Sequence, residues 1–110
     1  MSSLASKLKH RLAIMRPPDP EIDVDEAGQP LDKWVIVAEP WAAIKTLRGR
    51  ELSAAQQINA EITTEITIRY RTGIDRTMKA MYMEDEFEFL YVIHKDYAKK
   101  ELQIFAKVHQ

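Results

Sequence analysis

The segment Thr64-Glu65-Ile66-Thr67-Ile68-Arg69-Tyr70-Arg71 carries the strongest structural signal in the chain. Apolar and polar side chains alternate along it with a period of two, which is typical of a β-strand with one face toward a core and one toward water. The alternation extends back to residue 62, so the expected core face carries Ile62, Thr64, Ile66, Ile68 and Tyr70. The sequence therefore predicts a half-buried strand here, in a fold built mainly from β-structure.

The C-terminal third repeats this pattern in shorter runs. Strands are predicted over residues 78–83, 87–94 and 101–108, because each run is rich in β-branched or aromatic residues and is bounded by turn residues. Residues 87–94 are apolar on both faces, which favours a central strand. Predicted turns separate these strands at 72–75, at Glu84-Asp85-Glu86 and at 96–99.

The N-terminal half contains two more strand signals and one helix signal. Residues 8–15 alternate with a period of two until Pro17 and Pro18 stop the strand. Residues 33–47 contain Pro40, which cannot donate to a sheet, so we expect two strand pieces, 33–39 and 41–47, with a bend or bulge at Glu39-Pro40. Residues 49–59 have helical spacing of Leu52, Ala55 and Ile58, which predicts one short helix.

Between the first two strand regions lies a long acidic loop, residues 17–30. Its four prolines remove backbone donors, and no basic residue accompanies its acids. A loop of this length in a compact domain is usually functional or mobile. The acids are Asp19, Glu21, Asp23, Asp25 and Glu26.

These elements predict an all-β fold, a small six-stranded β-barrel or sandwich with one short α-helix. The length of 110 residues suits a single domain, 1–110, with one core. Residues 1–6 are small and polar and are expected to be flexible.

Composition excludes several classes of protein. The formal net charge is -1, from 16 basic and 17 acidic side chains, whereas a dedicated nucleic-acid binder usually has a clear basic excess. The chain contains no cysteine, which excludes disulfides, thiolate metal sites and cysteine nucleophiles. No apolar run has the length of a membrane span, and the N-terminus lacks the apolar core of a signal peptide, so we expect synthesis and use in the cytoplasm or in an assembly built there.

The sequence offers no catalytic residue, metal ligand set or cofactor site. His10, His94 and His109 are far apart, and none has a second ligand at metal spacing. The acids at 84–86 lie in a predicted turn, where solvated carboxylates are usual. Three glycines cannot build a phosphate cradle. We therefore expect a protein that is not an enzyme and needs no cofactor.

Two polar segments and one basic edge are the candidate interfaces. The acidic loop and the stretch from 48 to 57 are polar segments next to strong strands, and either could face a partner or a channel. Opposite charge suggests that the basic N-terminal strand meets the acidic loop across a subunit boundary. The candidate residues in the second segment are Arg48, Arg50, Glu51, Gln56 and Gln57, and those of the basic edge are Lys7, Lys9, Arg11 and Arg16.

The order of these features resembles the head–tail joining family of tailed bacteriophages, also called head-completion or stopper proteins. The resemblance runs over about residues 7–108. It rests on the following segments in order: Leu8-Lys9-His10-Arg11-Leu12-Ala13-Ile14, Lys33-Trp34, Val37-Ala38-Glu39-Pro40-Trp41-Ala42-Ala43, Leu47-Arg48-Gly49-Arg50-Glu51, Ala54-Ala55-Gln56, Thr64 to Arg71, Gly73-Ile74 and Met78. The C-terminal third departs from the family, because Glu84-Asp85-Glu86-Phe87 stands where many members carry a glycine before the aromatic.

The resemblance implies a structural virion protein of a tailed phage or prophage, located at the head–tail interface and assembled in the host cytoplasm. It implies a homo-oligomeric ring, usually a dodecamer, below the portal and its adaptor. The ring completes the head, retains packaged double-stranded DNA, which passes through the lumen without sequence-specific binding, and docks the tail terminator or tail tube protein. In some relatives a loop closes the channel.

Two other classes stay open from the sequence. One is a stand-alone barrel of OB or SH3 type that binds nucleic acid, which predicts a basic face with exposed aromatics. The sequence shows no such face, since Tyr70, Phe87, Phe89 and Tyr91 fall on apolar faces and are expected in the core. The other is a small enzyme or regulator, for which no site is found.

Overall fold

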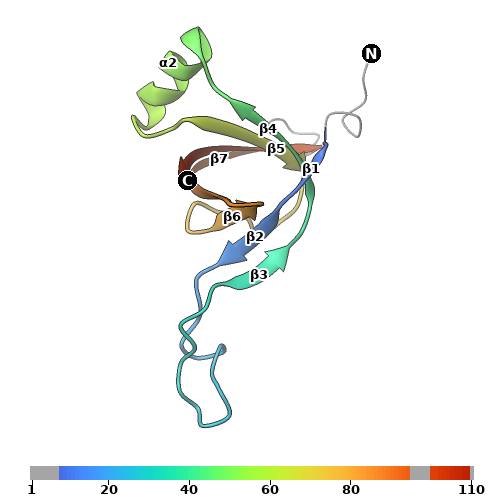
Figure 1. Cartoon of the computed structure of the whole chain (residues 1–110), viewed down its shortest axis with the longest axis vertical. Helices are drawn as coiled ribbons and strands as arrows, with labels where there is room; N and C mark the ends of the chain where they lie inside the picture. The colour runs from blue at the N-terminus through green and yellow to red at the C-terminus, as the bar shows by residue number, and fades with distance from the viewer. Residues whose placement is uncertain (1–7, 95–99, 110) are drawn as a thin grey trace.

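The computed structural model describes residues 8–94 and 100–109 (Figure 1). This part of the chain forms eight strands and one helix. The strands are β1 (His10–Arg11), β2 (Ala13–Arg16), β3 (Val35–Ala38), β4 (Trp41–Thr46), β5 (Thr64–Arg69), β6 (Lys79–Tyr82), β7 (Asp85–His94) and β8 (Glu101–His109), and the helix is α2 (Gly49–Ile58). The predicted flexible N-terminus and the predicted turn at 96–99 lie outside the described residues.

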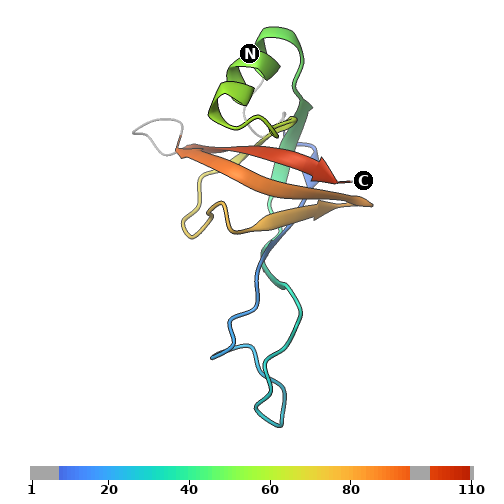
Figure 2. The ribbon, with the colours of Figure 1, turned by 90° about the vertical axis from the view of Figure 1, so that its left-hand side faces the viewer.

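All strands belong to one antiparallel sheet with the order β1-β4-β5-β8-β7-β6-β2-β3. β1 stands at one end of this order and β2 stands next to β3 at the other, although only Leu12 separates β1 from β2 in the sequence. The chain therefore brings the two ends of the sheet together, and the sheet curls into a half-barrel (Figures 1 and 2). His10 of β1 adds a side-chain link between the ends, because its Nδ1 lies 2.9 Å from the Tyr82 hydroxyl of β6.

The count of six strands was wrong, because two predicted runs are each broken into two strands. The predicted bend at Glu39-Pro40 is confirmed and separates β3 from β4. The break at Leu12, which separates β1 from β2, was not predicted. The two breaks face each other, since the Leu12 amide donates to the Pro40 carbonyl at 3.0 Å.

The main core lies on one face of the curled sheet. Ile62, which precedes β5, is fully buried in a second cluster, and Tyr70 after β5 is half-buried. β5 buries the predicted face in the main core through Ile66 and Ile68, which are fully buried. β8 pairs with β5 along its whole length and places Leu102, Ile104 and Ala106 in the same core, as the alternation predicted. These residues pack with Leu12, Ile14, Ala42, Met78, Ala80, Phe87 and Phe89.

A β-bulge at Leu90 lets β7 place side chains in two separate hydrophobic clusters. The register of β7 against β8 shifts between Phe89, which faces Ala106, and Tyr91, which faces Phe105. Phe89 belongs to the main core, whereas Leu90 packs with a second, smaller cluster. The predicted central strand with apolar residues on both faces is therefore confirmed, and β6 and β8 pair with its two edges.

In the second cluster, α2, the predicted helix, packs against the sheet. Ala55 of α2 is buried against Leu47 and Ile62, with Leu52 and Phe105 packed around them. An ion pair of 2.5 Å between Lys45 on β4 and Glu51 on α2 lies at the same junction, and its hydrogen bond raises the pKa of Lys45. The helix thus covers part of the sheet's second face.

The turn predicted at 84–86 starts one residue earlier and ends two residues earlier. The turn consists of Met83 and Glu84, and Met83 takes a left-handed backbone with φ 53°. Asp85 and Glu86 already belong to β7, where they pair with Tyr82 and Met81. Three consecutive acids are typical of a solvated turn, and the prediction rested on that pattern. In the structure, strand pairing with β6 continues through two of these acids.

We predict that Ile66→Ala lowers the free energy of unfolding by about 2–5 kcal/mol, because the side chain is fully buried and its removal leaves a cavity. Ile36→Ala is the matched control: this side chain is 52% exposed on β3, and we expect a change of about 0.5 kcal/mol. Urea unfolding followed by circular dichroism measures both. Equal losses for the two variants contradict this assignment of the core.

Candidate functional site

The most prominent surface feature is the segment between β2 and β3, residues 17–34, which we call the arm. It extends away from the sheet, at the bottom of Figures 1 and 2. The protein measures 52 × 29 × 28 Å, and the arm lies along the long axis. It contains the predicted acidic loop.

The base of the arm is closed by an ion pair between Arg16 and Asp23. The Arg16 guanidinium donates two hydrogen bonds to the Asp23 carboxylate, at 2.7 and 3.2 Å. The Asp19 amide donates a third, at 2.7 Å. The hydrogen bond from Arg16, with that from Asp19, holds the pKa of the Asp23 carboxyl below its ordinary value. The same contact raises the pKa of Arg16.

The tip of the arm is held by Asp25. Its Oδ1 accepts hydrogen bonds from the amides of Ala27 and Gln29, each at 2.9 Å, and its carbonyl accepts one from Gly28 at 3.0 Å. Gly28 has φ 80°, a backbone conformation that favours glycine. A β-bridge between Val24 and Pro30 continues the hairpin toward the base. The arm is therefore an ordered hairpin.

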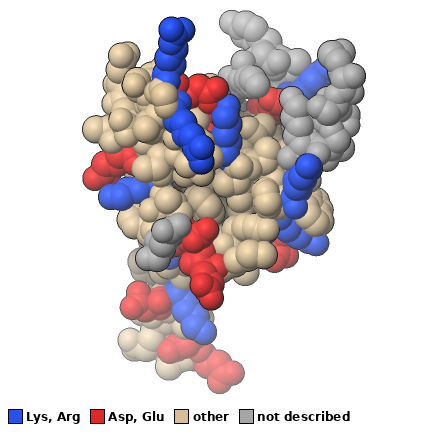
Figure 3. Space-filling model, turned by 45° about the horizontal axis from the view of Figure 1, so that its top comes forward, with Lys and Arg blue, Asp and Glu red and all other residues tan. Residues whose placement is uncertain are grey.

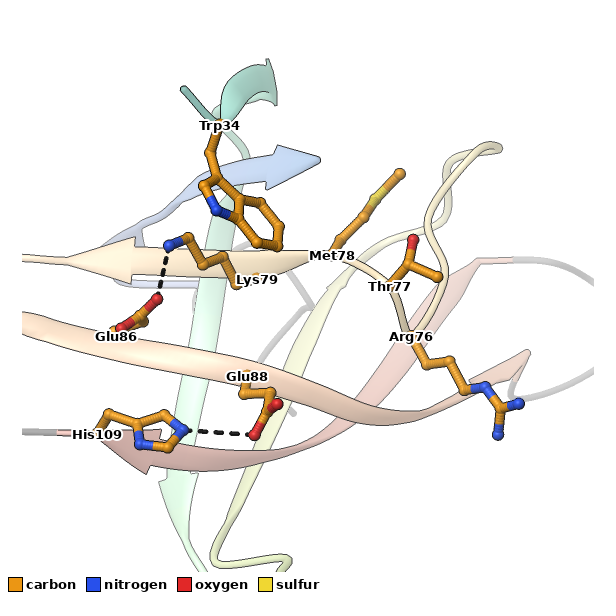
Figure 4. A pocket seen from close by; sticks show the side chains of 8 residues that line it. All are labelled: Trp34, Arg76, Thr77, Met78, Lys79, Glu86, Glu88 and His109. Atoms are coloured by element: carbon orange, nitrogen blue, oxygen red, sulfur yellow. Dashed lines mark hydrogen bonds and ion pairs between the residues drawn. The ribbon is translucent and has the colours of Figure 1, made fainter. Parts of the chain in front are cut away.

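Trp34 anchors the return of the arm to the sheet. Its ring lies under the Lys79 ammonium, 4.3 Å from nitrogen to ring centre, and Lys79 pairs with Glu86 at 2.7 Å (Figure 4). Glu88 and His109 form a second polar contact of 3.4 Å in the same cavity, which has a volume of about 250 Å³. The groups lining this cavity largely satisfy each other, which suits a structural junction better than a ligand site.

The structure gives the predicted acids of the arm two different environments. Asp19, Asp23 and Asp25 accept backbone hydrogen bonds and shape the hairpin. The side chains of Glu21 and Glu26 are exposed. Figure 3 shows acidic side chains on the projecting arm, at the bottom of the view.

The arm and its neighbouring strand β3 also expose apolar side chains, which the sequence analysis did not single out. Ile22 on the arm is 70% exposed. Partly exposed apolar side chains continue from it to β3, and they are Val24, Leu31, Trp34, Ile36 and Val37. β3 pairs only with β2 among the described strands, so its other edge is open.

The second predicted segment forms α2 and its N-terminal neighbour Arg48. Arg48, Arg50, Glu51, Gln56 and Gln57 are all exposed. Gln56 donates to the Ile62 carbonyl at 3.3 Å, and Glu51 pairs with Lys45. Because α2 and the arm lie at opposite ends of the long axis, the structure does not bring these two candidate segments together (Figure 1).

The predicted basic edge is divided by the structure. Lys7 lies outside the described residues, and Arg16 belongs to the base of the arm. Lys9 and Arg11 are exposed. Arg11 donates to the Glu39 carbonyl at 3.2 Å, and its guanidinium carbon lies 5.9 Å from the ring centre of Trp41.

Trp41 belongs to a site that sequence reasoning missed. A hollow of about 260 Å³, which we call the basic pocket, is lined by Leu8, Pro40, Trp41, Arg69, Tyr70 and Arg71. Trp41 is 53% exposed because it follows the break at Pro40 and points away from the buried Ala42. Among the described residues, neither Arg69 nor Arg71 takes part in an ion pair.

The expectation that no basic face carries exposed aromatics, and that Tyr91 lies in the core, is therefore wrong. Trp34 is 40%, Trp41 53% and Tyr91 43% exposed. Tyr91 follows the bulge at Leu90, which turns it away from the main core where the alternation had placed it. Phe87 and Phe89 are buried as predicted.

Within residues 8–94 and 100–109, no cluster of three or more metal-ligating side chains is present. No helix in that part of the chain combines the length and apolar character needed to cross a membrane.

Comparisons with known proteins agree with this geometry. The model of a family described as phage head completion protein matches residues 4–109. The fold is similar to the solution structure of protein SF1141 from Shigella flexneri 2a, with a TM-score of 0.67 and 20% identity over 96% of each chain. It is also similar to a chain in the virion of a native gene transfer agent particle, with a TM-score of 0.55 and 18% identity over 90% of this chain and 92% of that one. No curated protein matches the chain.

We predict that Asp23→Asn loosens the arm, because the neutral amide no longer pairs with Arg16. Limited proteolysis is expected to cut within 17–34 faster than in the unaltered protein, while the sheet keeps its circular dichroism. Glu26→Gln removes one charge from an exposed arm position and is the control, for which we expect no change. Equal cleavage of the Asp23→Asn variant and the unaltered protein contradicts the role of this ion pair.

The same ion pair predicts a dependence on pH. The folded-state pKa of Asp23 is lowered, so its contribution is present above the ordinary aspartate value of about 3.9 and is lost as pH falls through the lowered value. Amide exchange at Asp19, measured by NMR and corrected for intrinsic rates, should keep its protection down to about pH 4. Loss of protection already between pH 7 and 5 contradicts this assignment.

Proposed function

The chain belongs to the phage head completion protein family, and we propose from this premise that it forms a ring at the head–tail interface of the virion. Membership makes it a structural component of a phage virion. In the proposal, a homo-oligomeric ring, dodecameric as in the resembling family, sits below the portal and its adaptor. It retains packaged DNA and docks the tail terminator or tail tube protein.

The observation that carries this proposal is an ordered arm on a firmly packed sheet. The sheet has a continuous core on one face and a helix-covered cluster on the other. The arm is fixed at its base by Arg16 and Asp23 and projects beyond the sheet. A rigid body with a projecting segment suits a ring subunit, because the segment can contact a neighbour or the channel while the body stays unchanged.

The net charge of -1 agrees with a conduit for DNA better than with a DNA-binding protein. Exposed acids repel phosphates, so a surface that carries them lets DNA pass without retaining it by contact. Retention of the genome in this proposal comes from the ring's position and closure. DNA sequence plays no part in it.

The first test is negative-stain electron microscopy of the chain mixed with the portal and adaptor proteins of the same virion. We expect a ring at the adaptor end of the portal. Binding as isolated subunits without a ring contradicts the proposal, and so does the absence of any portal or adaptor binding.

The second test removes residues 19–28 from the arm. Because the arm lies outside both cores, we predict a folded subunit that fails in ring assembly or leaves heads that lose their DNA, measured by the fraction of filled heads. Replacing the same residues by a glycine–serine linker of equal length is the control for chain connectivity, and it should fail in the same way. Unfolding of the deletion variant contradicts the separation of core and arm.

A second candidate function is nucleic-acid binding by a stand-alone small barrel, which the basic pocket favours. Trp41 and Tyr70 beside Arg69 and Arg71 are residue types that stack on bases and neutralise phosphates. A gel-retardation assay with the purified chain at physiological salt separates the two functions. Ring formation predicts no retardation of free DNA, and a salt-resistant complex of the monomer contradicts ring formation as the function.

A further inference from the structure

The arm and the basic pocket have opposite charge and lie in different parts of the protein. We propose that they bind each other between copies: the arm of one subunit docks into the basic pocket of the next. This inference rests on the proposed ring and names the two surfaces that build it. Because the surfaces differ, each subunit offers one of each, which is the arrangement that a closed ring repeats.

The arm carries a strong acidic excess. Residues 17–34 contain six acids and one base, Lys33. Asp23 is neutralised within the subunit by Arg16 at 2.7 Å and is therefore not available to a partner. The five remaining acids against Lys33 leave a charge of about -4 on this segment, and they are Asp19, Glu21, Asp25, Glu26 and Asp32.

The surroundings of the basic pocket carry the opposite excess. Arg69 and Arg71 line the pocket at the end of β5, and Arg11 of β1 lies beside its Trp41. Two further bases adjoin the lining in the chain or in space, Lys9 next to Leu8 and Lys100 next to Tyr70, which makes five. Lys100 adjoins the pocket, since its carbonyl accepts a hydrogen bond from the Tyr70 amide at 3.0 Å. Two acids lie nearby, Glu39 beside Arg11 and Glu101 across the ladder from Arg69. The five bases against these two acids leave a charge of about +3.

The two surfaces also match in their apolar parts. Ile22 is 70% exposed and Leu31 41% exposed on the arm, while Trp41 is 53% exposed at the pocket. Burying a large aliphatic side chain against an aromatic ring is favourable, and a charged rim fixes the orientation of such a contact. An apolar centre with complementary charges around it is the composition of a protein interface.

The geometry favours binding between copies over binding within one. The arm points away from the sheet at one end of the long axis (Figures 1 and 2). The pocket lies at β1, the start of β4 and the end of β5, in the other half of the protein (Figure 1). The ordered hairpin, held by Asp23 and Asp25, keeps the arm directed outward.

Charge reversal tests the proposal on the full chain. Glu21→Lys, Glu26→Lys and Asp32→Lys together change the charge of the arm from about -4 to about +2, and Arg69→Glu with Arg71→Glu changes that of the pocket from about +3 to about -1. Each variant alone sets like charges against each other, so we expect self-association to weaken by about a hundredfold. Sedimentation velocity over a concentration series measures the effect, and circular dichroism checks that both variants are folded.

An equimolar mixture of the two variants is the decisive sample. Each arm then meets a pocket of opposite charge, so we expect association to return toward that of the unaltered chain. Raising the salt concentration should weaken association of the unaltered chain and of the mixture alike, because the contact is partly electrostatic. A mixture that stays monomeric overturns the inference, and so do variants that associate like the unaltered chain.

Cysteine cross-linking gives a second readout that does not depend on charge. The chain has no cysteine, so introduced ones are the only reactive thiols. A mixture of Ile22→Cys and Trp41→Cys subunits should form mixed cross-linked dimers under mild oxidation. Met83→Cys replaces Ile22→Cys in the control, because Met83 is 86% exposed but lies outside the arm, and no dimer with Trp41→Cys is expected.

The outcomes separate this inference from the proposed function. A ring that forms on the portal while both charge variants still join it overturns the arm-to-pocket contact and leaves the ring intact. An unaltered chain that stays monomeric, together with Ile22→Cys and Trp41→Cys subunits that form no mixed cross-link, also overturns this contact. If the monomer retards DNA and Arg69→Glu with Arg71→Glu abolishes that, the pocket is a nucleic-acid site, and both proposals fail.

Discussion

The hydrogen bond from the Leu12 amide to the Pro40 carbonyl joins the two breaks on which the rest of the structure depends. Pro40 has no amide hydrogen and ends the ladder of β3, while the break at Leu12 lets β1 join one end of the sheet and β2 pair with β3 at the other. The sheet therefore curls, and the hairpin of β2 and β3 continues beyond it as the arm. The break at Pro40 leaves Trp41 at the surface, where it forms the basic pocket with Arg69 and Arg71.

In this arrangement, the residues that stabilise the fold are different from those that are available to contact a neighbouring subunit. The free energy of folding comes mainly from the apolar residues buried by β5, β7 and β8, whereas the arm contributes to neither core. Polar contacts keep the arm in shape: Asp23 closes its base and Asp25 its tip. A subunit built in this way can present two distinct surfaces to its neighbours without rearranging its core, which suits repeated assembly of identical chains.

The sequence predicted what depends on local pattern. The period of two placed β5 and β8 with their buried faces, and helical spacing placed α2. It missed features that arise from contacts between distant segments. The break at Leu12 is compensated by Pro40, and the bulge at Leu90 depends on pairing with β8, so the alternation showed neither. The basic pocket was missed because its residues come from separate segments at 8, 40–41 and 69–71. Composition identified the acidic loop. Its ordered conformation depends on the ion pair between Arg16 and Asp23, which lie seven residues apart in the sequence.

The contact between the arm and the basic pocket of the next subunit is tested most directly by an electron cryomicroscopy reconstruction of the assembled virion at the head–tail interface, at a resolution that shows side chains. We expect a ring in which the arm of each subunit, with Ile22 at its centre, lies on Trp41, Arg69 and Arg71 of the next. A ring in which every basic pocket is empty or filled by DNA, and in which the arms contact no neighbouring copy, contradicts it.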